Sequence, residues 1–531
     1  MDKAPHELIR NIVRLIKPTK GLERLFPYAT ISKLFQEAVE EITFQSLALT
    51  TQDLAVFRSI FQGKNIVRRN FLKLLSLQFE LPKLRHGACL LKFTPNRETD
   101  SATISEGIQV IFQILSVADS QLERVAPLKL HFMKAYRQNE CTHHHWTSQV
   151  DVKSTRAQYG FYKVLIGTEL PSIGNIHEFS FQGNRFKGLD YVALANTASK
   201  LPDLRSLYLS LHDFYEWGTD NRIKQRTGFS DGITKIRGQS LEEINIIVSH
   251  DIQKNDCVQA HDLVLDADPF RKSFWHISQF KQLSRLRITG PMVITSDLFT
   301  LPTYLEEGIV FPALKHFVLH ISPETADGKW FFLKNEEKER DALNDPRWKE
   351  YFHELELEDS ESSSSDYIDT EELDGSMLVF GESATRLRRV NPCRCKSELN
   401  PETATPFLGN AAKLLGSLPG IQTYIIRITG DHNERKKWKP MKQPWIRGRD
   451  FEVQYLRRGN SWDSDGMHYD QPSALKEDLT VDRLYWRFAE SMPQDDVQQY
   501  WYQAVGRDCQ IWRLRQKWRS LYCFDEEISQ C

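Results

Sequence analysis

The chain has 531 residues, of which 40% are hydrophobic and 26% are charged. These values are typical of a globular protein and exclude a collagen-like or wholly disordered chain. Lys and Arg (69) nearly balance Asp and Glu (71), so the net charge is -2. We therefore exclude a protein coated in basic charge and do not expect nucleic acid as a partner.

The expected setting is a reducing compartment. No apolar run reaches the roughly 18 residues of a membrane helix, so no membrane partner is expected. The eight cysteines are too sparse for a disulfide framework. Charged residues such as Arg10 and Arg14 interrupt the region where a signal peptide would be apolar. We expect a cytoplasmic or nuclear protein with reduced thiols.

The first seventy residues predict helices around one short strand. Apolar residues at positions 8, 9, 12, 13, 15 and 16 follow Pro5 at helical spacing, and Lys17-Pro18 ends the helix. A second helix is predicted over 31–41, a short strand over 43–50, and a third helix over 52–62.

The N-terminal residues carry a family resemblance. Pro5-x-Glu7-Leu8, followed by Ile12 and Ile16, is similar to the opening of an F-box. The stretch 31–35 (Ile-Ser-Lys-Leu-Phe) resembles the later Val-Ser/Cys-Lys-x-Trp segment of that motif. The region 27–47 is similar to the start of fungal F-box-like proteins. The resemblance covers about residues 3–50.

The resemblance implies a function and a set of contact residues. It implies that the N-terminal helices dock the linker subunit of an SCF-type ubiquitin ligase while the rest of the chain binds an unknown protein substrate. The adaptor would act by raising the effective concentration of substrate near the ligase. The candidate linker-binding residues are Pro5, Leu8, Ile9, Ile12, Ile31 and Leu34.

One apolar phrase recurs through the middle of the chain. Its form is apolar-x-x-apolar-x-apolar, and its ending has the alternation of a strand with one buried face. Its copies begin at Leu72, Val125, Ile176, Leu204, Leu241, Leu283, Leu314, Phe352 and Ile421. Predicted helices or loops lie between the copies, for example over 105–118 and 189–200.

A strand and a helix in each unit predict stacked repeats. The phrase resembles the strand portion of a leucine-rich repeat, so we predict an irregular leucine-rich-repeat-like α/β solenoid over 51–430. Successive copies start 28 to 69 residues apart, and all but the shortest spacing exceed the regular repeat length of about 20–29 residues. The alternative is an α/β domain with a parallel sheet, whose strands also alternate with helices. Either interpretation requires parallel, buried strands.

Two charged stretches and an aromatic segment complete the chain. Residues 354–374 hold ten acidic residues and predict a disordered insert, and residues 434–442 are basic. A strand is predicted over 450–456, and helices over 478–490 and 494–522. We expect residues 431–531 to form a strand plus an α-rich cap, with residues 1–50 as the F-box-like segment.

Matches to catalytic and metal-binding motifs occur, but the residues around them do not fit what each motif requires. Gly228-Phe-Ser-Asp-Gly232 matches a nucleophile elbow, but residues 220–227 cannot form the buried strand that an elbow needs. Cys141 with His143–His145, and Cys393 with Cys395, lack zinc-site spacing. We predict no catalytic residue, no metal ligand and no cofactor, and therefore a non-enzymatic protein.

Two alternatives to the adaptor remain. The chain is a scaffold without a ligase link if the N-terminal helices only cap the first repeat. It is an enzyme if dispersed residues assemble a site in a deep pocket. Solvent exposure separates the first two interpretations. Docking requires Leu8, Ile12 and Leu34 to stay partly accessible, whereas capping buries them.

Overall fold

The computed structural model describes most of the chain. The residues described are 5–16, 22–82, 97–123, 125–136, 169–182, 189–213, 218–250, 260–305, 310–334, 336, 396–428, 451–461, 478–488, 492–518 and 524–530. The chain divides into two compact units. The first comprises residues 1–249, 272–288 and 307–315, and the second comprises 250–271, 289–306 and 316–531.

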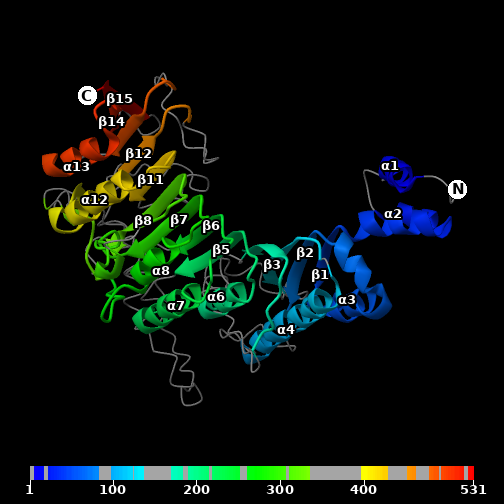
Figure 1. Ribbon diagram of the computed structural model, residues 1–531. Helices are drawn as coiled ribbons and strands as arrows, with labels where there is room; N and C mark the ends of the chain where they lie inside the picture. The colour runs from blue at the N-terminus through cyan, green and yellow to red at the C-terminus, as the bar shows by residue number, and fades with distance from the viewer. Residues whose placement is uncertain are drawn as a thin grey trace, which may run out of the picture. The chain divides into compact units, whose positions relative to one another are not determined.

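The first unit alternates strands with helices (Figure 1). Its strands lie side by side in chain order: β1 (Ser46–Thr50), β2 (Leu74–Glu80), β3 (Leu128–Tyr136), β4 (Ile176–Phe181), β5 (Ser206–Asp213), β6 (Glu243–His250) and the start of β7 (Arg285–Ile294). Its helices are α1 (His6–Ile16), η1 (Leu22–Thr30), α2 (Lys33–Phe44), η2 (Thr51–Asp53), α3 (Leu54–Phe61), η3 (Gly63–Phe71), α4 (Arg97–Gln121), α6 (Tyr191–Ser199), α7 (Gly218–Ile233) and most of α8 (Pro269–Ile277).

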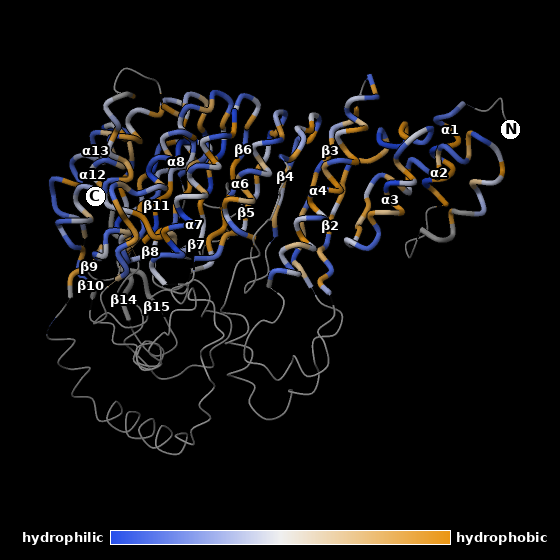
Figure 2. Tube along the Cα trace, turned by 90° about the horizontal axis from the view of Figure 1, so that it is seen from below, coloured by the Kyte–Doolittle hydropathy of each residue, from blue (hydrophilic) through white to orange (hydrophobic). Residues whose placement is uncertain are grey.

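Strands β1 to β5 are parallel, and their alternate residues form the core of this unit. Leu75, Leu130, Phe179 and Leu207 pair in register across β2 to β5, and all four are fully buried. Helices α4, α6 and α7 lie on one face of these strands (Figure 1). Hydrophobic and hydrophilic residues accordingly alternate along the strands (Figure 2).

The second unit combines parallel and antiparallel strands. Its strands are β8 (His316–Thr325), β9 (Phe332–Lys334), β10 (Lys396–Leu399), β11 (Thr423–Ile428), β12 (Phe451–Leu456), β13 (Arg483–Phe488), β14 (Gln510–Trp518) and β15 (Phe524–Gln530). A short η6 (Thr303–Leu305), α12 (Pro401–Gly416) and α13 (Asp495–Val505) complete it. Trp501 on α13 packs against Tyr424 and Trp486, and its indole N–H donates to the Leu408 carbonyl oxygen at 3.1 Å.

The predicted leucine-rich-repeat solenoid is wrong. The chain forms a mixed α/β fold on a mostly parallel central sheet, Rossmann-like in its alternation of strands and helices. The connections include helices as long as the 25-residue α4, instead of the short returns of a leucine-rich repeat. The recurring phrase did locate strands, since β2 to β8 and β11 coincide with its copies. The phrase indicates a strand with one buried face, and such strands occur both in a leucine-rich-repeat solenoid and in an α/β sheet.

The expected α-rich C-terminal cap is also wrong. The strand predicted over 450–456 is β12, but the predicted helix over 478–490 contains strand β13. Only the first part of 494–522 is helical, because α13 ends at Gly506 (φ 85°) and β14 follows. The strands that hold the phrase are parallel as predicted where their pairing is described, from β2 to β5 and between β8 and β11. The antiparallel pairs are formed by the later strands: β12 with β11 and β13, and β15 with β14.

Several sequence predictions fall outside the described residues. They are the phrase beginning at Phe352, the acidic insert 354–374, the basic stretch 434–442, Cys141 with His143–His145, and Cys393 with Cys395. The domain limits 1–50, 51–430 and 431–531 stay a prediction.

One described helix is long and apolar enough to cross a membrane by length and composition alone. It comprises Glu98–Gln121, and 56% of its most apolar window is buried within the chain. Burial of this extent is also a property of core helices, so the segment is weak evidence for membrane insertion.

The Gly-x-Ser-x-Gly motif serves helix packing. Residues 228–232 lie within α7, so the strand that an elbow requires is missing, as predicted. A Cβ built at Gly232 would lie 2.2 Å from the Ala195 Cβ of α6, and one built at Gly228 would lie 2.1 Å from Val192 Cγ2. The two glycines, four residues apart on one face of α7, therefore permit the close approach of α6.

We expect Gly232→Ala to lower the stability of the first unit by about 1–3 kcal/mol, because the added methyl group overlaps the Ala195 Cβ and crowds the α6 backbone at 3.2 Å. Helix propensity alone predicts the opposite sign, a gain of up to about 1 kcal/mol. The matched control is Gly409→Ala on α12, where the new Cβ meets Tyr500 at an ordinary 3.6 Å. Thermal unfolding of the full chain measures both variants. A Gly232→Ala protein at least as stable as wild type would contradict the packing role.

Candidate protein-docking site

The N-terminal helices form a small core of their own. Helix α1 starts at Pro5, whose carbonyl oxygen accepts hydrogen bonds from the amides of Leu8 (2.9 Å) and Ile9 (3.3 Å). The helix buries two residues four apart, Ile9 and Val13, which are 1% and 0% exposed. They join a cluster with Leu25, Phe35, Ala38, Val39 and Ile42 from η1 and α2.

Helix α2 is positioned by a cap and by ion pairs. Ser32 caps it, because the hydroxyl oxygen accepts from the Phe35 amide at 3.4 Å. Arg10 of α1 pairs with Glu41 of α2, and His6 lies 3.9 Å from Glu37. These pairs join α1 and α2 on the flank of their shared apolar contact.

A second anchor connects α2 to η3. The Arg68 guanidinium donates to both Glu40 carboxylate oxygens, at 2.6 and 3.0 Å, and lies 5.6 Å from the centre of the Phe44 ring. Burial acts to raise the pKa of Glu40, but the hydrogen bonds from Arg68 and Gln36 outweigh it and lower the pKa. The helix pair is therefore attached to its unit by an ionised carboxylate.

A second apolar stripe of α1 faces solvent. Leu8 is 51% exposed, Ile12 is 38% and Leu15 is 86%. These residues, spaced i, i+4 and i+7 on one face of the helix, are named the docking strip here. Ile31, immediately before the cap of α2, is 50% exposed. A single exposed Leu is ordinary, but three at helical spacing form a continuous apolar surface.

The six linker-binding candidates differ in their solvent exposure. Pro5, Leu8, Ile12 and Ile31 are exposed, while Leu34 is half-buried against the core cluster. Ile9 belongs to that cluster and is inaccessible, so it is left out of the proposed contact surface. Leu15 was not among the candidates although it is the most exposed apolar residue of α1. Its position seven residues after Leu8 places it on the same helix face, and this spacing could have identified it in the sequence.

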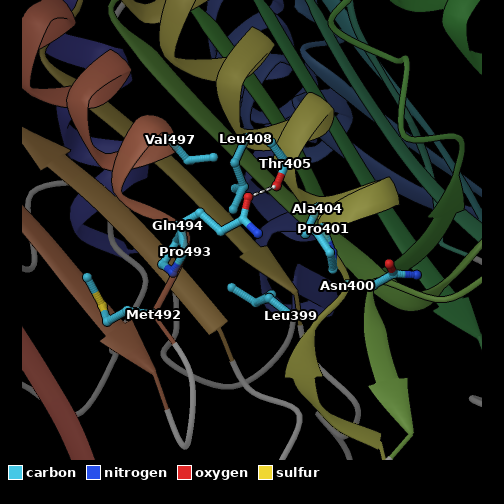
Figure 3. Close-up of a pocket in the computed structure, with 10 residues that line it drawn as sticks. All are labelled: Leu399, Asn400, Pro401, Ala404, Thr405, Leu408, Met492, Pro493, Gln494 and Val497. Carbon is cyan, nitrogen blue, oxygen red and sulfur yellow. Dashed lines mark hydrogen bonds between the residues drawn. The ribbon is translucent and has the colours of Figure 1, made fainter.

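The small pocket of the second unit is a poor candidate for an active site. It lies between the N-terminal ends of α12 and α13, and the hydroxyl of Thr405 donates to Gln494 Oε1 across it at 3.4 Å (Figure 3). It holds about 250 Å³ including open solvent, below the range of about 300–1,000 Å³ typical of ligand pockets. The lining residues are Leu399, Asn400, Pro401, Ala404, Thr405, Leu408, Met492, Pro493, Gln494 and Val497, none of which is ionisable.

The described titratable groups with shifted pKa values do not assemble a reactive site. Burial raises the pKa of Asp119 to about 6, against the attraction of the Arg69 guanidinium. Burial also raises the pKa of the Cys509 thiol to about 12, which keeps it protonated and unreactive. Among the described residues no cluster of His, Cys, Asp and Glu could hold a metal ion. The described strands β1 to β7 run in chain order, without the reversal that forms a ligand crevice.

No protein-family model matches the chain, and no curated protein matches it.

We expect the Glu40–Arg68 contact to make the stability of α2 depend on pH. Because the folded-state pKa of Glu40 lies below its ordinary value of 4.5, the contribution is complete above pH 4.5. It is lost as the pH falls through the lowered value. Hydrogen exchange of α2 amides should therefore be faster in Glu40→Gln than in wild type at pH 7, with the difference vanishing at acid pH.

The control for this prediction is Glu106→Gln, which removes an exposed carboxylate of α4. It should leave α2 protection unchanged at both pH values. A difference between Glu40→Gln and wild type that persists undiminished in acid would contradict the electrostatic role of Glu40.

Proposed function

We propose that the chain is a non-enzymatic adaptor whose N-terminal helices dock a partner through the docking strip. The linker subunit of an SCF-type ubiquitin ligase is the partner that the F-box-like residues favour. The observation that carries the proposal is the exposure of Leu8, Ile12 and Leu15 on a helix whose adjacent stripe, Ile9 and Val13, is buried. Nothing in the folding of these helices requires that outward stripe to be apolar.

The exposure also favours docking over capping. A capping helix would bury Leu8 and Ile12 against the rest of the chain, whereas both are more than a third exposed. The helices are held by the buried cluster around Phe35 and by the Arg68–Glu40 contact instead. The surface that a partner would cover is thus separate from the surface that keeps the helices folded.

The order of the elements fits an adaptor, with a docking segment followed by a separate folded body. The strip belongs to α1, at the start of the first unit, and the sheet follows in sequence. Such an adaptor transfers no group itself. It would accelerate transfer by holding a substrate near a ligase, which raises the effective concentration of that substrate.

The test is co-purification with the linker subunit, comparing wild type with the triple variant Leu8→Ala/Ile12→Ala/Leu15→Ala. Each truncation removes about 1–2 kcal/mol of apolar contact if the side chain is covered by a partner. We therefore expect the triple variant to bind at least a hundredfold more weakly. Because the three side chains contribute nothing to the buried cluster, the variant should keep the wild-type circular dichroism spectrum.

The matched control is Val56→Ala on α3, an exposed apolar residue of the same unit that lies outside the docking strip. It should retain the linker. Failure of the wild-type chain to recover any linker would contradict the ligase assignment. Equal recovery by wild type and the triple variant would contradict the strip as the contact surface.

A further inference from the structure

The open face of the first unit's sheet carries an organised set of polar side chains. Helices α4, α6 and α7 lie on one face of this sheet (Figure 1). Because successive side chains of a strand alternate between faces, the residues between the buried ones in β3 to β7 belong to the other face. The residues named the polar face here are Lys129, His131, Glu178, Tyr208, Glu243, Asn245, Arg285 and Arg287.

The burial pattern shows that this face is not a second core. Leu130, Phe132, Leu207 and Leu209 are buried, while the residues between them are partly exposed. A parallel sheet in an α/β protein is usually covered on both faces and its strands are continuously apolar. Strands β3 and β5 instead alternate, which is the pattern of a sheet with one face left to solvent or to a partner.

The acidic residues of the polar face are already neutralised within it. Glu178 accepts from Lys129 at 2.7 Å and contacts His131 at 2.8 Å. Burial acts to raise the pKa of Glu178, but the hydrogen bonds from Lys129 and His131 outweigh it and lower the pKa. Glu243 accepts from the Tyr208 hydroxyl at 2.8 Å and from Arg285 at 3.4 Å.

One arginine next to these pairs is not neutralised by a described acidic residue. Among the described residues Arg287 has no ion-pair partner, and its Nε is buried without an acceptor. On the adjacent strand β6, the Oδ1 of Asn245 is buried without a donor. Two residues further along β6, on the same face, Ile247 is 50% exposed. The neighbouring strands β6 and β7 thus offer a cation and an apolar contact to a partner, while Asn245 Oδ1 lies beneath the surface between them.

We propose that the polar face binds an extended acidic segment of a protein partner. A carboxylate of the segment pairs with the terminal nitrogens of Arg287, which are not among its buried atoms, and an apolar side chain next to the carboxylate covers Ile247. A carboxylate suits the guanidinium because Arg presents two parallel N–H donors to it. This proposal does not rest on the ligase assignment, since it uses none of the residues of the docking strip.

The experiment measures fluorescence anisotropy of labelled twelve-residue probes with the full chain. The acidic probe alternates Glu with Val, and the comparison probes alternate Lys with Val or are twelve-nucleotide oligouridylate. We expect the acidic peptide to bind most tightly and to weaken as salt rises. We expect Arg287→Ala to weaken it by about tenfold, corresponding to 1.4 kcal/mol, and Arg287→Glu by more. Arg287→Lys should restore part of the affinity.

The matched control is Lys224→Ala, which removes one positive charge from the exposed side of α7. It should bind the acidic peptide as wild type does, and so should the triple variant of the docking strip. Equal binding of the acidic and basic peptides, or tighter binding of oligouridylate, would overturn the proposal. So would an Arg287→Glu variant that has the wild-type circular dichroism spectrum and keeps full affinity. If the acidic peptide binds as predicted while no linker is recovered, only the ligase assignment fails.

Discussion

One-sided burial of parallel strands is the constraint on which the first unit depends. Residues such as Leu75, Leu130, Phe179 and Leu207 pair in register and must all be removed from water on the same face. Helices α4, α6 and α7 supply that cover, and the glycines at 228 and 232 let α7 approach α6 closely enough to do so. Because alternate residues point the other way, covering one face leaves the second face available for polar side chains and their ion pairs.

Helix α1 likewise has one stripe that is buried for folding and another that is left to solvent. The helix has one wide apolar face, and the stripe through Ile9 and Val13 on one side of that face is sufficient to hold it in the cluster. Ion pairs and the Glu40–Arg68 contact then fix α2, so stability does not draw on Leu8, Ile12 or Leu15. An apolar stripe that folding does not use is costly to expose and risks aggregation. Its presence is most simply explained by a partner that covers it.

The sequence predicted the strands better than it predicted how they are connected. The apolar phrase located β2 to β8 and β11 because a buried strand face leaves a period of two in any fold. It carries no information on connection length, which separates a solenoid from an α/β sheet. The C-terminal errors have a local cause: Trp512, Leu514 and Trp518 lie at alternate positions with Arg and Lys between them, but the density of aromatic residues suggested a helical face. The glycine at 506 was the break between α13 and β14.

The candidate site was predictable only in part, for a related reason. Apolar residues at 8, 9, 12, 13, 15 and 16 predict a helix, but on such a helix the pattern does not say which stripe is buried. That choice depends on tertiary contacts, which placed Ile9 inside and left Leu15 outside. The polar face could not be predicted from spacing at all, since Lys129 and Glu178 are 49 residues apart and meet only through strand register. The two surfaces thus arise from one rule: residues that folding does not bury remain available for contact, as apolar side chains on α1 and as polar side chains on β6 and β7.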